Sequence, residues 1–120
     1  MKVAVGSMGY DLDSSASDIF GGSSAFIIIN LDEEKIRGVS IIENPAKNGT
    51  GAGSTAAQIM VDHEVKAVIS GKLGPVAFLI LKNEGIRVYK FTPGSVEKNL
   101  KRFNEGRLEE ITTLSGGFPL

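Results

Sequence analysis

The chain has 120 residues, of which 42% are hydrophobic and 22% charged, and its formal net charge is −1. This length suits one domain with a buried core, and the balanced charge offers no attraction for nucleic acid or an anionic membrane. The absence of cysteine excludes disulfides and thiolate metal sites. The apolar run at residues 25–29 is too short to span a bilayer. The first residues indicate a strand rather than a signal peptide, so we expect a cytoplasmic protein.

Three strands are predicted in the first part of the chain. The sequence "KVAVGS" at residues 2–7 is a short β-branched run that ends near glycine, and a long polar loop follows it. The runs "AFIIINL" at 25–31 and "KIRGVSIIE" at 35–43 are separated by a tight polar turn. They therefore predict an antiparallel hairpin.

The pattern changes after the hairpin to helices that alternate with strands. Apolar residues recur at helical spacing after a glycine-rich loop, and Thr55 followed by Gln58 has the form of a capping box. Residues 66–70 predict a short buried strand, and residues 86–91 predict another strand.

Proline and glycine mark the limits of two further helices. Pro75 suits the first position of a helix that Gly85 ends. In the same way, Thr92 as N-cap and Pro93 at the first position predict a third helix, which ends at Gly106.

The predicted element order is β-β-β-α-β-α-β-α, which indicates one α/β domain. Strands that alternate with helices require parallel pairing through right-handed crossovers, whereas the hairpin makes the sheet mixed. We expect a five-stranded mixed sheet in a three-layer, ribonuclease H-like fold. The domain is expected over residues 1–111, with 112–120 as a C-terminal tail that follows the docked Leu108 and Ile111.

Glycines gather in the loops at one end of this sheet, the end at which its parallel strands finish; we call it the carboxyl end. Ligands of open α/β sheets bind at this end, and the N-termini of the three predicted helices would bring unpaired N–H groups there for an anion. The alternative is that these short loops need glycine for their turns and bind nothing. The glycines concerned are Gly9, Gly21, Gly22, Gly49, Gly51, Gly53, Gly71, Gly74 and Gly94.

Familiar catalytic and nucleotide-binding motifs are not matched. The loop "GTGAGST" lacks the lysine of a P-loop and the spacing of a dinucleotide fingerprint. A ribonuclease H-like nuclease needs a carboxylate on the first strand, and residues 2–7 contain none. The single histidine, His63, is expected at the opposite end of the sheet, which excludes a Ser-His-Asp set. We therefore expect no enzyme.

Several segments together resemble the dinitrogenase iron–molybdenum cofactor-binding domain family over about residues 1 to 111. They are "KVAV", "DIFGGSSAFIIINLD", "IIENP…GTGAGSTAAQIM", "VKAVISGKLGPVAF", "EGIRVYKFTPGSVEKNL" and "EGRLEE". The resemblance implies a ribonuclease H-like fold and a role in binding or carrying the iron–molybdenum cofactor or an iron–sulfur precursor, with cofactor-assembly proteins as partners. Carriers of the family typically have a histidine before the Phe-Gly of the first loop, and here Ile19 takes that place.

The sequence thus predicts a non-enzymatic binding protein for an anionic ligand, by resemblance an iron–molybdenum or iron–sulfur cluster or its precursor. The alternative is a regulatory or protein-interaction domain that keeps the fold and has lost the metal site. Backbone amides would hold the ligand, helped by the charge of Lys72 and by Ser7 or the thioether of Met8. The alternative interpretation of Lys72 is an ordinary solvated lysine. The candidate residues are Ser7, Met8, Ile19, Phe20, Gly21, Gly22, Asn44, Gly49, Gly51, Gly53, Ser54, Gly71, Lys72 and Gly74.

Overall fold

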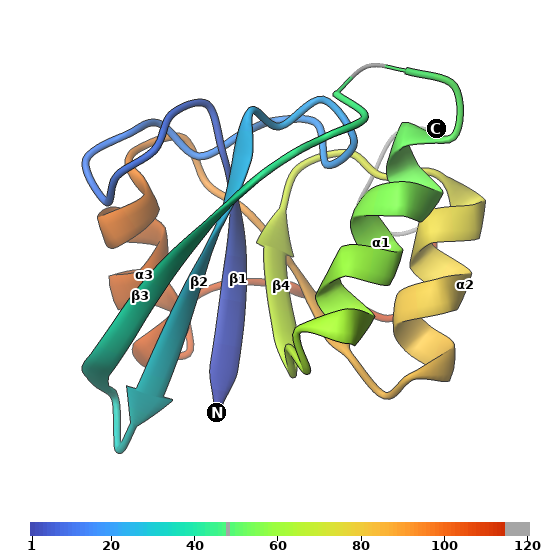
Figure 1. The fold of residues 1–120 in the computed structure, drawn as a ribbon. Coiled ribbons are helices and arrows are strands. Elements are labelled where there is room, and N and C mark those ends of the chain that lie inside the picture. The colour runs from blue at the N-terminus through green and yellow to red at the C-terminus, as the bar shows by residue number, and fades with distance from the viewer. Residues whose placement is uncertain (48, 115–120) are drawn as a thin grey trace.

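A computed structural model describes residues 1–47 and 49–114 of the chain. Within these residues, three helices and one sheet of six strands form the domain shown in Figure 1. The strands are β1 (Lys2–Ser7), β2 (Ala25–Asp32), β3 (Lys35–Glu43), β4 (Ala67–Ser70), β5 (Arg87–Lys90) and β6 (Glu110–Ile111), and the helices are α1 (Ala52–Asp62), α2 (Pro75–Asn83) and α3 (Val96–Asn104).

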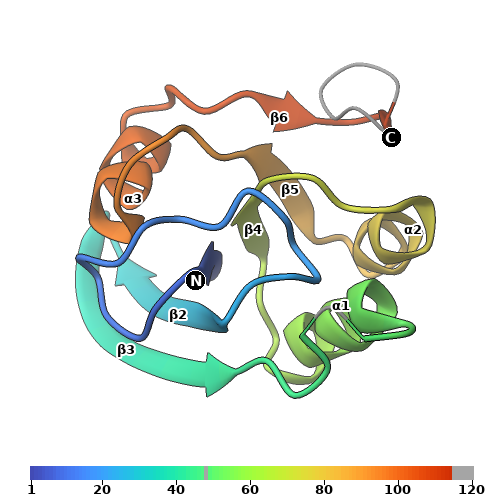
Figure 2. The same cartoon turned by 90° about the horizontal axis from the view of Figure 1, so that it is seen from above.

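The sheet has the strand order β3-β2-β1-β4-β5-β6 and is mixed. The hairpin strands β2 and β3 pair antiparallel, β1 pairs antiparallel with β2, and β4 pairs parallel with both β1 and β5. Helices α1 and α2 cover one face and α3 covers the other (Figure 2). The predicted mixed sheet and three-layer, ribonuclease H-like arrangement are confirmed.

The strand number differs from the prediction, because six strands form instead of five. The additional strand, β6, has two residues and pairs antiparallel with β5. A strand of this length carries no readable alternation. The docking of the segment was predicted correctly, since Leu108 and Ile111 are buried. Of the predicted tail, residues 115–120 lie outside the described residues.

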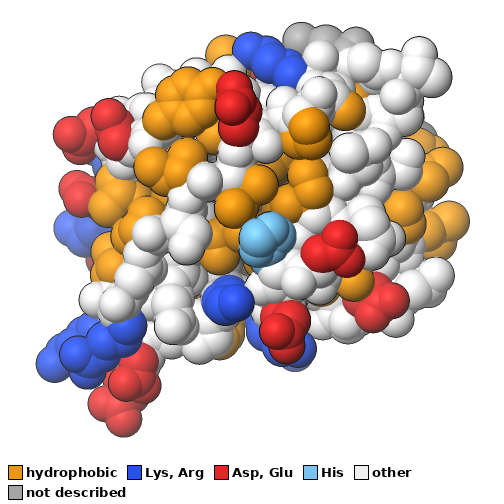
Figure 3. Space-filling view, viewed as in Figure 1, with side chains coloured by type: hydrophobic (Ala, Val, Ile, Leu, Met, Phe, Trp, Pro, Cys, Tyr) orange, Lys and Arg blue, Asp and Glu red, His pale blue; other side chains and the backbone are white. Residues whose placement is uncertain are grey.

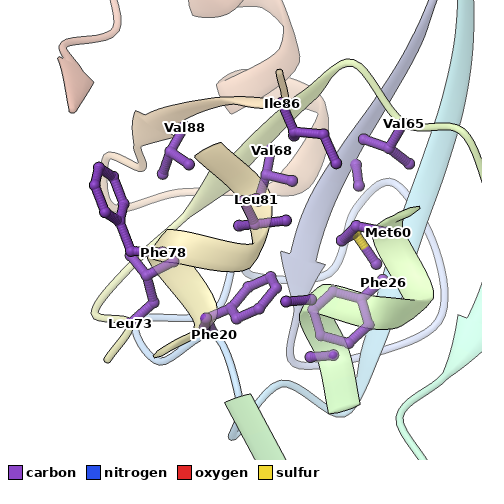
Figure 4. Packing of buried hydrophobic residues seen from close by; sticks show 14 of the residues in the cluster. Phe20, Phe26, Met60, Val65, Val68, Leu73, Phe78, Leu81, Ile86 and Val88 are labelled. Carbon is purple, nitrogen blue, oxygen red and sulfur yellow. The ribbon is translucent and has the colours of Figure 1, made fainter. Parts of the chain in front are cut away.

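Side chains that alternate across the strands feed two cores, one on each face of the sheet. On β4, Val68 packs under α1 and α2, whereas Ile69 packs under α3. The first core contains three phenylalanines and Met60. Figure 4 shows Phe20 and Phe26 near Met60, with Phe78 further along beside Leu73. Burying each such side chain contributes about 1.5–3 kcal/mol, so both helical layers are fixed to the sheet.

Two helices begin at residues other than those predicted. Helix α1 starts after Gly51, whose φ of 73° is left-handed, and no side chain caps it. Thr55 is therefore no N-cap: its N–H donates to the carbonyl of Gly51 at 3.0 Å. The Gln58 side chain donates to Asp62 instead of reaching back. The predicted capping box is wrong, because a glycine that adopts positive φ starts the helix about one turn earlier.

Helix α3, in contrast to α1, begins later than expected. Its N-cap is Ser95, whose hydroxyl accepts from the N–H of Lys98 at 3.1 Å. Thr92 belongs to the preceding loop, where its N–H donates to the buried side chain of Asn99 at 2.8 Å. The prediction of Thr92 as N-cap and Pro93 at the first position is therefore wrong.

The limits of α2 are as predicted. Pro75 occupies the first position and Gly85, with φ 72°, follows the helix. The two ends of the sheet also have the predicted polarity: all three helices begin at the carboxyl end, and His63 lies at the opposite end as the C-cap of α1 (Figure 1). No helix in the described part of the chain is long and apolar enough to cross a membrane.

Candidate functional site

A hollow of about 410 Å³ lies at the carboxyl end of the sheet, between the starts of α1 and α2. Three loops that are far apart in the sequence line it: the loop after β1, the glycine loop before α1 and the loop after β4. The described residues that line it are Ile19, Phe20, Gly21, Gly22, Gly49, Ala52, Gly53, Lys72, Leu73, Gly74 and Pro75.

The loop after β1 crosses the loop after β4 and is bonded to it along the backbone. The N–H of Phe20 donates to the carbonyl of Lys72 at 2.8 Å, and the N–H of Lys72 donates to the carbonyl of Asp18 at 2.8 Å. Ile19 and Lys72 thus form a short parallel bridge. Because both sides of this crossing are backbone, the wall of the hollow is fixed without constraining the Lys72 side chain.

Phe20 anchors this crossing in the core. Its side chain is fully buried, and its ring lies 5.3 Å from the ring of Phe26 at a tilt of 54°. Figure 4 shows the two rings near Met60 and Leu81, on the side of the sheet that α1 and α2 cover. The neighbouring Ile19 is 47% exposed at the hollow. Phe20 therefore belongs to the core, whereas the adjacent Ile19 is exposed at the hollow.

The loop then passes against the start of α1, and this close approach favours glycine at position 21. A Cβ on Gly21 would lie 3.0 Å from the backbone nitrogen of Gly53, which is tighter than normal packing. The buried Asn44 holds the loop from the other side, because its side-chain amide donates to the carbonyls of Gly21 at 3.0 Å and Ser23 at 2.9 Å. Asn44 thus positions the loop and does not line the hollow.

The electrostatics of the hollow favour a negative group. Lys72 is the one charged residue among the described residues that line it. Helices α1 and α2 both begin there, with no side-chain cap and no acidic residue in the first turn. Helix α3, by contrast, has Ser95 as a cap and Glu97 in its first turn. Ala52 already donates its N–H to the carbonyl of Gly49 at 3.1 Å, and Pro75 has no N–H. The later N–H groups of these two first turns, which no side chain caps, and the positive dipole ends of α1 and α2 are available to an anion.

The structure brings together eight of the fourteen predicted site residues. Those that line the hollow are Ile19, Phe20, Gly21, Gly22, Gly49, Gly53, Lys72 and Gly74. The other six support it or lie elsewhere: Ser7, Met8, Asn44, Gly51, Ser54 and Gly71.

The residues outside the lining have their own structural roles. The buried hydroxyl of Ser7 bonds to the backbone of Gly9, and the side chain of Ser54 donates to the carbonyl of Gly51. The Met8 side chain is 52% exposed and does not line the hollow. Among the lining residues, Ala52, Leu73 and Pro75 were missed. Their position directly beside the predicted glycines was the available signal.

Side chains suited to direct metal ligation are scarce. No group of three or more His, Cys, Asp or Glu side chains that could hold a metal ion occurs within residues 1–47 and 49–114. His63, at the far end of α1, is remote from the hollow. The hollow therefore suits an anion held by N–H groups and a lysine better than a metal bonded to side chains.

Comparison with known proteins agrees with this architecture. The model of the family described as dinitrogenase iron-molybdenum cofactor matches residues 1–106. The chain belongs to this family. The chain is also similar to the uncharacterized protein MJ0580 of Methanocaldococcus jannaschii. The two sequences are 35% identical over 113 residues, which cover 92% of this chain and 96% of the relative. The resemblance stated from the sequence is thus confirmed.

Solved structures extend the likeness to the fold. The NMR structure of TM1290 from Thermotoga, described as a candidate NifB protein, is 38% identical with a TM-score of 0.82, covering 93% of this chain and 94% of that one. The apo form of the orange protein from Desulfovibrio gigas has a TM-score of 0.84 at 24% identity, with 92% of each chain covered. At that identity the second likeness concerns the fold alone.

Proposed function

We propose that this member of the dinitrogenase iron-molybdenum cofactor family is a non-enzymatic carrier that binds an anionic ligand in the hollow. The observation that carries the proposal is the absence of side-chain caps at the N-termini of the two helices beside the hollow. The two helices that begin at the hollow, α1 and α2, have neither a side-chain cap nor an acidic residue in the first turn, whereas α3 has both. Helix N-termini left open in this way, together with Lys72, bind negative groups.

The family match supports the ligand class that we propose: an iron–molybdenum or iron–sulfur cluster, or a precursor, carried as cargo. Such clusters are anions whose sulfides accept hydrogen bonds from backbone N–H groups. In this chain Ile19 stands where the resemblance implies a histidine ligand, and no described residue of the hollow is a histidine, cysteine or carboxylate. We infer that the residues present fit a cluster held as an anion, and that they do not fit one bonded through a side chain.

Cofactor-assembly proteins would then deliver and receive the cargo. A carrier that makes no metal–side-chain bond releases its cargo readily, because hydrogen bonds to N–H groups and one lysine exchange faster than metal ligands. The alternative is an interaction domain that keeps the fold without a cluster. The exposed apolar side chain of Ile19 at the hollow is compatible with a protein contact there.

Anaerobic titration tests the proposal, with an iron–sulfur cluster donor and, separately, with iron–molybdenum cofactor. We expect saturable visible absorbance on the protein and amide chemical-shift changes centred on Gly21, Gly53 and Lys72. The absence of uptake with the fold intact would contradict the carrier function and favour the interaction domain. Uptake with shifts elsewhere would contradict the assignment of the hollow.

A further inference from the structure

The outer side of β3 is open along its whole length. The strand stands at the end of the sheet order, so among the described residues it pairs on one side only, with β2. In the view of Figure 2 no other element runs along its outer side. Its nine residues are exposed apart from the half-buried Ile42. A long open edge of this kind is a template for pairing with another strand.

The backbone directions on β3 follow from its neighbours. The N–H of Leu31 on β2 donates to the carbonyl of Met1 at 2.8 Å, toward β1. Backbone groups alternate in direction along a strand. Ile28 lies three residues before Leu31, so it directs its N–H and C=O groups the opposite way, toward β3, where its partner is Ser40. The two residues that flank Ser40 on β3 therefore direct their N–H and C=O groups outward, away from the sheet.

The side chains of those two residues, Val39 and Ile41, are 44% and 46% exposed and lie on the face that α3 covers elsewhere. Beyond them, at the two ends of the same segment, are Arg37 and Glu43. Figure 3 shows hydrophobic side chains gathered along the β3 side of the molecule, with charged side chains at the hairpin tip. The segment therefore reads basic–apolar–apolar–acidic from one end to the other.

We propose that a second copy of the chain docks along β3 in the antiparallel direction, with the twofold axis at Ser40. In this register Val39 of each copy lies opposite Ile41 of the other, and Arg37 of each lies opposite Glu43 of the other. Both contacts are favourable cross-strand pairs, and the outward backbone groups pair with each other. The segment is thus complementary to itself in charge and in hydrophobicity, which is what a twofold contact requires.

A β-bulge sets one limit to the pairing. The register between β2 and β3 shifts at Asn30/Leu31, which leaves Arg37 as the extra residue on β3. Bulges end regular pairing on an edge strand, so the contact runs over residues 37–43. The existing contacts of its charged residues are weak: Arg37 lies 3.6 Å from Asp32, both exposed, and Tyr10 bonds to Glu43 at 3.4 Å. Neither competes strongly with pairing across the twofold axis.

Docking in this way joins the two sheets into one and leaves the hollow open, because no described residue that lines the hollow belongs to β3. Self-association and ligand binding are therefore separate properties of the chain. Failure of one test leaves the other unaffected.

Sedimentation velocity over a range of concentrations tests the contact. We expect a monomer–dimer equilibrium that Arg37→Glu weakens about tenfold, because it places like charges opposite each other at both ends. The double variant Arg37→Glu with Glu43→Arg reverses both charges and should restore the wild-type affinity. Val39→Pro removes an outward N–H and should abolish the dimer. Circular dichroism would check that each variant is folded.

The register has a direct readout in a mixed sample of isotope-labelled and unlabelled chains. We expect intermolecular nuclear Overhauser effects between the methyl groups of Val39 and Ile41. A chain that remains monomeric at millimolar concentration would overturn the proposal. So would a dimer without these effects, or one in which the double variant is as weak as Arg37→Glu alone.

Discussion

The carbonyl oxygen of Asp18 lies so close to Gly71 that a Cβ atom at position 71 would stand 2.1 Å from it. The same carbonyl accepts the N–H of Lys72 at 2.8 Å. The loop after β1 is therefore fastened across the end of β4 at a point where a side chain cannot fit. This contact positions Ile19 and Phe20 at the hollow.

Gly71→Ala should lower the free energy of unfolding by about 2–4 kcal/mol, because the new methyl group meets backbone that cannot move without breaking the crossing. Urea unfolding measures the effect. Gly74→Ala is the matched control: it lies three residues further along, with φ −79° and nothing within 4 Å of its Cβ position. We expect a loss of at most about 1 kcal/mol there, because Gly74 is the N-cap of α2 and alanine is a poorer N-cap than glycine. Equal losses in the two variants would contradict the contact.

The grouping of these loops around one hollow could be predicted from the sequence, but the reasons for individual glycines could not. Alternation of helices and strands fixes which loops share the carboxyl end of the sheet. That rule alone brought Gly21, Gly53 and Gly74 to one hollow. Gly71, by contrast, is required by a contact with a residue more than fifty positions earlier. One sequence carries no sign of such a pairing.

Local signals at helix starts were ambiguous for a related reason. The sequence offers two possible N-caps for α3: Thr92, which Pro93 follows, and Ser95. Both satisfy the known capping preferences. Tertiary structure decides between them, because the buried Asn99 side chain binds the backbone of Thr92 and holds it in the loop. A capping motif therefore predicts that a helix begins nearby, within a few residues.

Lys72→Gln should weaken binding of an anionic cluster about tenfold, since it removes the one positive side chain among the described lining residues. Its side chain is exposed and the crossing uses only its backbone, so stability should not change. Lys98→Gln on α3, away from the hollow, is the matched control with the same change in charge. Titration followed by visible absorbance compares the three proteins. A loss of affinity shared by both variants would indicate a nonspecific charge effect.

Ile19→His should strengthen cluster uptake. The side chain is 47% exposed at the hollow, so the change costs little stability and places an imidazole where a metal can reach it. A neutral imidazole binds metal, and a protonated one does not. The gain should therefore be present above about pH 7 and disappear as the pH falls below about 6. Ile19→Gln, which is polar but a poor ligand, is the control; an equal gain from glutamine would rule out coordination.

The hairpin turn between β2 and β3 holds Glu33 and Glu34 with φ of 51° and 69°. A two-residue turn with both central residues at positive φ favours Asn-Gly. The double substitution Glu33→Asn with Glu34→Gly should thus raise the free energy of unfolding by about 1–2 kcal/mol. Glu84→Gly, at an exposed helix C-cap with φ −92°, should give no such gain. Thermal unfolding measures both, and stabilisation by the control as well would show that strain at the turn is not the cause.

Two buried serines end the neighbouring parallel strands β1 and β4, and their hydroxyl groups differ in one respect. Ser7 donates to the carbonyl of Gly9 at 2.9 Å and accepts its N–H at 3.1 Å. The hydroxyl of Ser70 has no hydrogen-bond partner among the described residues. A buried hydroxyl without a partner is costly, whereas a bonded one contributes.

Ser70→Ala should therefore raise the free energy of unfolding by about 1 kcal/mol, and Ser7→Ala should lower it by about 1–2 kcal/mol. Urea unfolding at constant m-value separates the two results, since both substitutions remove the same atom from a buried site. If Ser70→Ala is destabilising instead, the hydroxyl has a partner in solution, and a buried water at the end of β4 would be the first candidate. Nuclear Overhauser effects between water and the amide protons of Gly71 and Lys72 in the wild-type chain would locate that water beside the crossing at the hollow.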